Sequence, residues 1–497
     1  MSTAEPARLA AAPVEAPASR TQNRVLAVCL VVGFATLVDQ SILTVAIPSL
    51  RASLGAGTAQ VQWIVAAYSL GFAVALVPAG RLGDAFGRRG LLVAGVATFS
   101  ALSIVAATAT ATSADVVVVC RLLQGVAAGT ANPQVIGLIQ EHFTGWRRTR
   151  ALGAYATVAA FAGVVAPLLG GAVVGLAGEA GGAWRWVVVL NVPFGLAVVV
   201  LGVAWLPGHA GRAAGPGRVR LDAVGAVLLG ATTLALLVPA VRLSGGGSAG
   251  WGSVVVVVVL VALLLLWERR CARRGGLPIL APDLLRLRSF ATGTLVATFA
   301  FGSALGTSLV LVLFLQEGLG LSAWEAGLVG APGAVVGAFC SAYAWRVSSR
   351  YGRPAVTLAL AAVATSLLVG AALVAWAPPA VLVGGLVVTQ VVAGAGGGLV
   401  HAPNQALTLE AVPLRSAGLA AGFLQVAQRI SAVLALAVLG GLVLASATVG
   451  DLDSYRRATV VALGVTSALV VAAAVASSTD RRASSTHGVV ALECAAT

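Results

Sequence analysis

Long apolar stretches recur along almost the whole chain and constrain its fold more than any other feature. A helix of about 20 apolar residues is long enough to cross the hydrocarbon core of a bilayer. This criterion predicts fourteen spans, at 25–47, 60–80, 90–112, 115–140, 151–177, 186–206, 222–242, 252–267, 290–316, 324–345, 355–376, 380–406, 416–446 and 457–476. The sequence therefore predicts an all-α membrane protein.

The composition excludes the other broad classes. Of the 497 residues, 59% are hydrophobic and 10% are charged, and the mean hydropathy is +0.97. Soluble domains have about a quarter of their residues charged. Disordered chains have low hydrophobicity. Neither class fits this composition.

The placement of arginine predicts the orientation in the membrane. All 31 basic residues are arginine, against 17 acidic residues. Such a basic chain can bind nucleic acid, but these arginines are scattered between apolar stretches, so we expect no nucleic-acid partner. With the N-terminus inside, 24 arginines fall on the cytoplasmic side, as the positive-inside rule requires. We expect a bacterial inner-membrane protein with both termini in the cytoplasm.

The sequence offers little for enzymatic chemistry. Nucleotide-binding loops and the H-E-x-x-H and C-x-x-C patterns are absent from it, so no metal and no cofactor are predicted. The segment 246–250 matches a G-x-S-x-G elbow, but it lies between two spans and not in a strand-turn-helix context. A membrane-embedded enzyme, such as a lipid transferase, would need several reactive groups at one depth. We therefore expect no enzymatic activity.

Three charged residues fall inside predicted spans, where charges are costly and usually functional. They are Asp39, Arg121 and Arg429. With a rise of about 1.5 Å per residue, Asp39 lies roughly 12 Å and Arg121 roughly 9 Å from the outer ends of their spans. The two can pair if their helices are neighbours, and a competitor for the arginine would then change the proton affinity of the acid. A fixed ion pair that only holds helices together is the alternative, and for Arg429 helix packing is an equal alternative.

Further polar residues at membrane depth are candidates for lining a cavity. A lone buried histidine is more often a satisfied core group than a proton carrier. The candidates are Asn132, Gln390, His401, Asn404, Gln405 and Arg429.

The connection between the second and third spans has a recognisable pattern. It reads Gly80-Arg-Leu-Gly-Asp84-Ala-Phe-Gly87-Arg88-Arg89 and resembles the signature of the major facilitator superfamily, G-x-L-a-D-r-x-G-r-[KR]. The resemblance implies that Gly80, Asp84, Gly87, Arg88 and Arg89 form a latch between conformations.

Four further segments resemble motifs of the fourteen-helix drug:proton antiporter branch of that superfamily. They are 39–48, 121–125 (with Gln124), 163–171 (with Gly163, Pro167, Gly170 and Gly171) and 184–195. The resemblance implies proton coupling through Asp39, Arg121 and Gln124. It also implies a 6+2+6 arrangement: a tail at 1–24, a bundle at 25–206, a two-helix insert at 207–289, a second bundle at 290–476 and a tail at 477–497.

The chain departs from these motifs at three positions. Thr44 stands where the branch has Asn, Ala166 where it has Gly, and Ser349 where an acid is expected in the second copy of the loop signature. That second copy still indicates an internal repeat, which is common in such transporters. The first two departures concern substrate range and details of antiport rather than the fold.

The expected function is export of hydrophobic or amphipathic small molecules in exchange for protons, by alternating access of a monomer. The proton gradient would drive it without a cofactor. One alternative is a facilitator that imports or exports an endogenous metabolite. Another is a non-transporting sensor, which would tolerate Asp39→Asn.

Overall fold

The computed structural model describes residues 19–109, 114–143, 145–177, 182–208, 222–244, 251–274, 284–410, 412, 417–448 and 451–480. A few side chains within these ranges, including those of Asp84 and Ser349, lie outside the description. All regular secondary structure in these ranges is helical.

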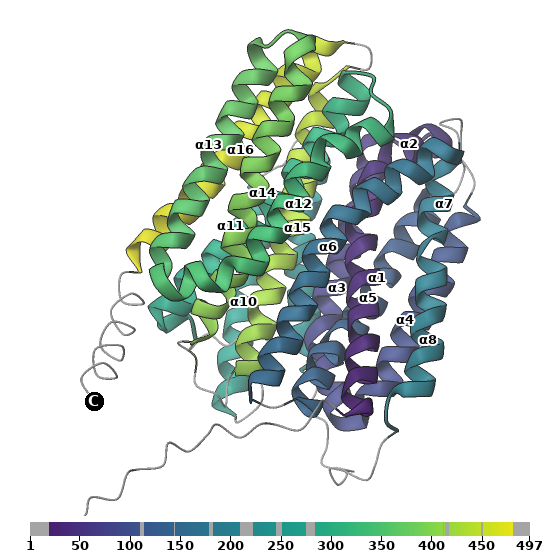
Figure 1. The fold of residues 1–497 in the computed structure, drawn as a ribbon, viewed down its shortest axis with the longest axis vertical. Coiled ribbons are helices and arrows are strands. Elements are labelled where there is room, and N and C mark those ends of the chain that lie inside the picture. Colours follow the sequence, from purple (N-terminus) through teal and green to yellow (C-terminus); the bar gives the residue numbers. More distant parts are fainter. Residues whose placement is uncertain are drawn as a thin grey trace, which may run out of the picture.

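The long helices follow one another with short connections (Figure 1). They are α1 (Arg20–Val45), α2 (Ile47–Leu54), α3 (Thr58–Phe86), α4 (Arg88–Ala107), α5 (Ala114–His142), α6 (Gly145–Ala177), α7 (Ala183–Val189), α8 (Asn191–Trp205), α9 (Ala223–Ser244), α10 (Trp251–Arg273), α11 (Arg288–Leu313), α12 (Ala323–Tyr351), α13 (Arg353–Trp376), α14 (Pro379–Glu410), α15 (Ala417–Ser446) and α16 (Leu452–Thr479). A 3-10 turn (η1, Leu284–Arg286) precedes α11, and a π-helical turn (η2, Phe314–Gly318) follows it.

Each of the fourteen predicted spans overlaps one of these helices. The span 186–206 is divided between α7 and α8, 290–316 runs from α11 into η2, and residues 110–112 of the span 90–112 lie outside the described residues. Among the described residues, twelve helices are long and apolar enough to cross a membrane. Two shorter apolar stretches, Phe161–Ala177 and Ala223–Pro239, belong to α6 and α9. A count of fourteen is compatible with these helices. The last helix runs three residues beyond the predicted span, to Thr479.

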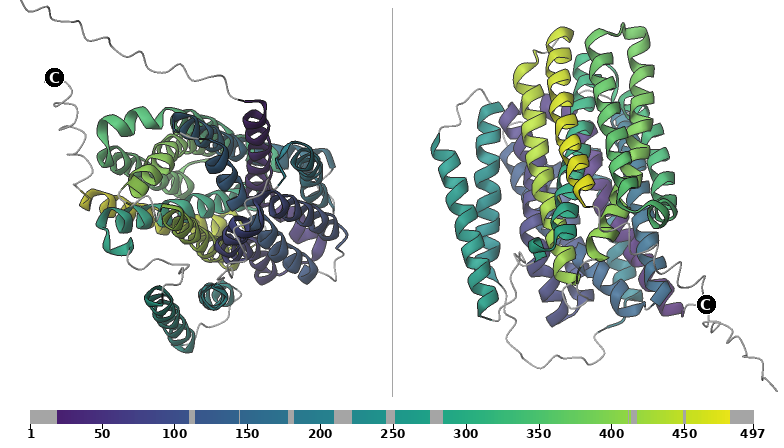
Figure 2. Two further views of the ribbon diagram at one scale, coloured as in Figure 1. Left: turned by 90° about the horizontal axis from the view of Figure 1, so that it is seen from below. Right: turned by 90° about the vertical axis from the view of Figure 1, so that its left-hand side faces the viewer.

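The helices form two groups with a pair beside them. Helices α1 to α8 pack together through α3 with α5, α4 with α5 and α1 with α6, and helices α11 to α16 through α12 with α14, α13 with α16 and α11 with α15. We call these the first and second groups. They meet where α6 packs on α12 and where α3 packs on α15. The pair α9 and α10 stands at the edge of the bundle (Figure 2).

Close helix contacts within the first group depend on residues without a side chain. A Cβ at Gly125 of α5 would collide with the backbone carbonyl of Tyr68 in α3, and one at Gly129 would lie 2.6 Å from the carbonyl oxygen of Phe72. Small residues allow such backbone approach between helices in a membrane, where dispersion packing replaces the hydrophobic effect.

Both groups contain a glycine with a positive φ that joins two consecutive helices. Gly87 joins α3 to α4 with φ of 97°, and Gly352 joins α12 to α13 with φ of 55°. Both values lie in the left-handed region that favours glycine. The end at which α1 begins and α3, α12 and α16 finish is here called the lower end, and the opposite end, which carries α2, the upper end.

Candidate functional site

A buried ion pair lies at the centre of the first group. Arg121 of α5 donates from Nη1 to Asp39 of α1, at 2.9 Å to Oδ2 and 3.2 Å to Oδ1. The side chains are only 3% and 2% exposed. The same Nη1 donates to Gln124 Oε1 at 3.0 Å. The structure thus brings together the three residues that the sequence predicts for proton coupling.

Three more side chains complete this site, and none of them was predicted from the sequence. Asn191, the first residue of α8, donates from Nδ2 to Asp39 Oδ1 at 2.6 Å. Gln124 donates to Ser103 Oγ of α4 at 2.9 Å. The guanidinium of Arg121 lies over the ring of Tyr68, 4.5 Å from its centroid. Five helices of the first group therefore position one carboxylate and one guanidinium.

A small pocket adjoins the ion pair and reaches both groups. Arg121 is one of its walls, so a molecule in the pocket meets the same guanidinium that holds the acid. The residues that line it are Leu43, Thr44, Val65, Tyr68, Ser69 and Arg121 from the first group and Leu305 and Leu436 from the second. Its lining is mainly apolar, with one aromatic ring and a few polar groups. Thr44 is the position at which the antiporter branch has Asn.

The second buried arginine, Arg429 of α15, lies between the two groups. Its guanidinium is 3.9 Å from the ring centroid of Phe72 in α3 and 5.6 Å from that of Phe301 in α11. The ring of His401 in α14 contacts Phe301 edge-on, with centroids 6.2 Å apart. Cations are attracted to aromatic faces, most strongly where water is excluded. Arg429 and His401 thus share one cation–aromatic cluster.

The other cavity candidates lie apart from the central pocket. Asn132 donates to the hydroxyl of Tyr155 in α6 at 3.1 Å. Gln390 is half-buried on α14, and Gln405 is exposed. Asn404 is buried at the lower end of the second group, in the cluster described below.

The predicted latch lies at the lower end of the first group. Arg88, the first residue of α4, pairs through Nε with Glu141 Oε1 of α5 at 2.5 Å, and the Glu141 side chain is 50% exposed. Arg89 donates to the carbonyl of Val203 in α8 at 2.6 Å. Gly80 lies within the last two turns of α3 and Gly87 directly follows this helix, while the side chain of Asp84 lies outside the described residues.

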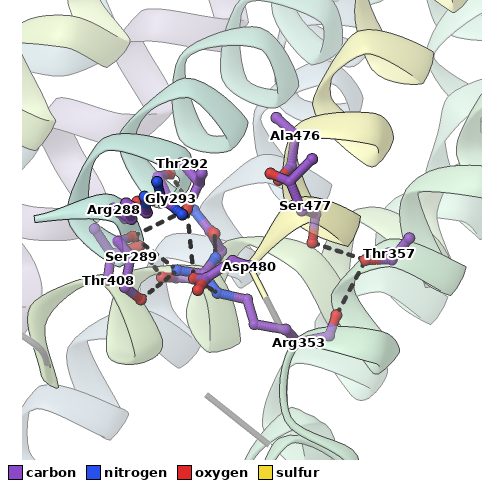
Figure 3. Close-up of polar contacts among 12 residues, drawn as sticks. Arg288, Ser289, Thr292, Gly293, Arg353, Thr357, Thr408, Ala476, Ser477 and Asp480 are labelled. Carbon is purple, nitrogen blue, oxygen red and sulfur yellow. Dashed lines mark hydrogen bonds and ion pairs between the residues drawn. The ribbon is translucent and has the colours of Figure 1, made fainter. Parts of the chain in front are cut away.

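The second copy of the signature forms a buried counterpart, here called the Arg353 cluster. Figure 3 shows Arg353 at the start of α13 reaching Asp480 at the end of α16 and Ser289 at the start of α11. Nε lies 3.2 Å from Asp480 Oδ2, and the two side chains are 2% and 5% exposed. Nη1 donates to Asn404 Oδ1 of α14 at 2.6 Å. An acid from the last helix therefore accompanies the arginine.

Two glycines of the predicted antiporter motif on α6 pack against different neighbouring helices. Pro167 lies inside this helix. A Cβ on Gly170 would lie 3.0 Å from Ile42 of α1, and one on Gly171 would lie 2.7 Å from the carbonyl oxygen of Ala323 in α12. Gly163 has open space around its Cα. The motif thus includes a close contact between the two groups near the upper end.

A second connection between the groups at the upper end, here called the upper clamp, was not predicted. Arg51 of α2 pairs with Glu317 of η2, with Nη1 and Oε2 3.3 Å apart. The hydroxyl of Tyr455 in α16 donates to the same oxygen at 2.5 Å. Glu317 directly follows the predicted span 290–316, so hydropathy gave no signal for it. Within the described part of the chain, no group of three His, Cys, Asp or Glu residues could hold a metal ion.

Comparison with known sequences identifies transport relatives. The family model described as Major Facilitator Superfamily matches residues 29–436. The chain is 33% identical to the probable actinorhodin transporter of Streptomyces coelicolor, covering 86% of this chain and 74% of the relative. It is 31% identical to the cephamycin export protein CmcT of Amycolatopsis lactamdurans, covering 84% of each. It is 30% identical to the tetracenomycin C resistance and export protein of Streptomyces glaucescens, covering 93% and 83%.

Solved structures with the same arrangement of helices include other transporters. One is a bacterial homologue of the human lysosomal transporter Spinster in an inward-facing conformation, with a TM-score of 0.64 and 16% identity over 94% of this chain and 98% of that one. Another is the xylose transporter XylE of Escherichia coli, with a TM-score of 0.64 and 13% identity over 93% and 98%. At these identities the similarity establishes the fold.

Proposed function

Because the chain belongs to the Major Facilitator Superfamily, and is therefore a multi-pass membrane transporter and not an enzyme, we propose that it exports hydrophobic or amphipathic small molecules in exchange for protons. Two relatives, named for export of cephamycin and of tetracenomycin C, support the direction of transport. The apolar, aromatic pocket supports the substrate class. The proton gradient is the energy source, and a monomer without cofactors suffices.

The observation that carries this proposal is the arginine shared by the ion pair and the pocket. Arg121 holds Asp39 at 2.9 Å and also lines the pocket. A carboxylate binds a proton more tightly when its neighbouring cation turns away. A substrate that fills the pocket keeps Arg121 on Asp39 and so favours the ionised acid. Protonation of Asp39 frees Arg121, which then turns into the pocket and displaces the substrate, so proton and substrate exclude one another.

Alternating access requires the pocket beside the ion pair, which has walls from both groups, to lie between two bundles that rock about it. We assign α1 to α8 and α11 to α16 to these bundles, with α9 and α10 as the insert. The arginine distribution supports a cytoplasmic location for the lower end and for both termini in a bacterial cell. In the conformation described here the upper clamp connects the bundles on the opposite, external side. The half-exposed Arg88–Glu141 pair serves as the latch on the cytoplasmic side.

The test is proton-driven uptake of doxorubicin, a fluorescent amphipathic compound, into inverted vesicles. The wild-type protein is expected to accumulate the compound and to dissipate the gradient. Asp39→Asn is expected to lower uptake at least tenfold at equal protein in the membrane. Asp115→Asn is the matched control, since this carboxylate lies at the upper end of α5 and contacts Gln60. Undiminished uptake by Asp39→Asn would refute the assigned role, and uptake only into right-side-out vesicles would indicate an importer.

A further inference from the structure

The helix pair α9 and α10 has one supported face and one open face. Helix α9 packs on α10 and also on α3 and α15, which belong to different bundles. Helix α10 is largely exposed, including Val254, Val255, Val258 and Leu266. In Figure 2 the pair stands outside the ring formed by the other helices. The inner helix of the insert therefore contacts both bundles, and the outer one faces lipid.

Helix α9 covers the line along which α3 and α15 meet, at two depths. Near the lower end, Leu229 of α9 belongs to one apolar cluster with Leu76 of α3 and Val426 of α15. Nearer the upper end, Leu237 of α9 belongs to another cluster with Leu70 of α3 and Val433 of α15. The helix thus lies along the seam between the two bundles for most of its length.

The contacts of the insert with α3 include a polar anchor at the lower end. Asp222, just before α9, accepts from Trp267 Nε1 of α10 at 2.7 Å and from the backbone N–H of Gly225 at 2.8 Å. Glu268 of α10 is fully buried beside it, and both acids interact electrostatically with Arg81 of α3. Higher up, a Cβ on Gly230 would lie 3.2 Å from Val74 of α3. Two acids and one arginine therefore hold the insert to the first bundle.

The contacts of α9 with α15 have a different character. The α15 residues that belong to the two clusters or pack on them are Val426, Ile430, Val433 and Ala437, all of them apolar. Apolar surfaces exchange easily for lipid tails inside a membrane, because lipid is as apolar as these side chains. Opposite charges that attract one another at a helix contact, as Arg81 and the two acids do, are in contrast costly to separate where water is scarce. A relative movement of the bundles is therefore expected to occur between α9 and α15.

From this asymmetry we propose that the insert is a cover carried by the first bundle, anchored through Arg81, which slides over α15 when the bundles rock. Arg81 belongs to the same signature segment as the latch, so this one segment contributes both to the latch and to the attachment of the insert. The cover keeps the α3–α15 seam closed to lipid and to membrane-dissolved substrate throughout the cycle. The inference rests on the proposed rocking of the two bundles.

Two cross-links in a cysteine-free background distinguish the two contacts of α9. The pair Val74→Cys with Gly230→Cys joins α9 to α3, and the pair Leu237→Cys with Val433→Cys joins α9 to α15. Each pair is closed with a short flexible bismaleimide, and doxorubicin uptake is measured in inverted vesicles. We expect the α9–α15 link to lower uptake at least tenfold and the α9–α3 link to leave it within about twofold. The reverse pattern, or equal effects of both links, would overturn the proposal.

A transport-independent measurement tests the anchor separately. Neutralising it with Asp222→Asn and Glu268→Gln is expected to slow cross-linking of the α9–α3 pair at least threefold. Asp451→Asn, at the upper end before α16, is the control and should leave that rate unchanged. An unchanged rate in the neutralised protein would refute the anchor. The cross-linking rate depends on neither substrate nor a proton gradient. It therefore still tests whether these acids hold α9 on α3 if the proposed transport function is wrong.

Discussion

Glu317→Gln is expected to loosen the upper clamp and to open the external side of the transporter. The substitution keeps the shape of the side chain and the hydrogen bond from Tyr455 but removes the charge that pairs with Arg51. A pair at 3.3 Å is worth about 5 kcal/mol in an effective dielectric of about 20, which is an upper bound. Exposed pairs measure about 0.2–1 kcal/mol.

The exposure of the two side chains indicates where the interaction energy of the Arg51–Glu317 pair lies between these two limits. Arg51 is 28% exposed and Glu317 is 12% exposed, so water screens the arginine only in part. A charge-assisted hydrogen bond of this kind contributes about 1.5 kcal/mol, which corresponds to a little more than a tenfold change in an equilibrium constant. We therefore expect the population that is open at the upper end to rise about tenfold.

The assay is alkylation of Thr44→Cys by an impermeant maleimide added from the external side. Thr44 lines the central pocket and is 7% exposed, so its alkylation rate follows the open population. Glu325→Gln is the matched control, because Glu325 contacts only its own helix cap through Ser322 among the bonds described. A reversed pair, Arg51→Glu with Glu317→Arg, should bring the rate back toward that of the parent. If Glu317→Gln leaves the rate unchanged, or the control raises it equally, the clamp is not what closes this side.

Three further predictions separate functional from structural contacts. Asn191→Ala removes a charge-assisted hydrogen bond to the central acid and is expected to lower uptake several-fold, with a loss of about 1.5–3 kcal/mol in stability measured by thermal unfolding in detergent. Arg88→Ala breaks a half-exposed pair and should lower uptake while reducing the free energy of unfolding by less than about 1 kcal/mol. Arg353→Met leaves a buried acid without its partner, so it should reduce the free energy of unfolding by about 3–5 kcal/mol and lower the amount of folded protein. Equal losses of stability in the two variants would contradict this distinction. Gly125→Val forces α3 and α5 apart and should abolish uptake, while Gly384→Ala, which meets open space, should not.

The central pair illustrates what the sequence can predict. Asp39 and Arg121 stand out because charges are rare in apolar spans, and the helical rise gives both a similar depth. Asn191 could not be assigned, because it lies 152 residues from Asp39 in the chain and an Asn at a span boundary has many uses. Which amide faces the acid depends on how α8 packs against α1, and composition does not encode that packing.

The lower end of the second bundle illustrates a different limit. Hydropathy ends the last span at residue 476 and gives Asp480 to the polar tail, and it places Asn404 among the cavity candidates. The structure puts both beside Arg353. A buried arginine needs acceptors from several directions, and this need extends α16 beyond its apolar stretch. The internal repeat predicts the position of Arg353, but the missing acid at Ser349 leaves its partner open.

The burial of Asp480 limits how far the C-terminus can be truncated and where a fusion partner can be attached. A truncation that removes this residue strips Arg353 of its counter-charge in a site sealed from solvent, so the product would misassemble for reasons unrelated to transport. Reporter domains fused to the C-terminus should be joined beyond it, through a spacer long enough not to pull on the last helical turn. Loss of uptake by such a fusion protein is then informative only if the Arg353–Asp480 pair is intact.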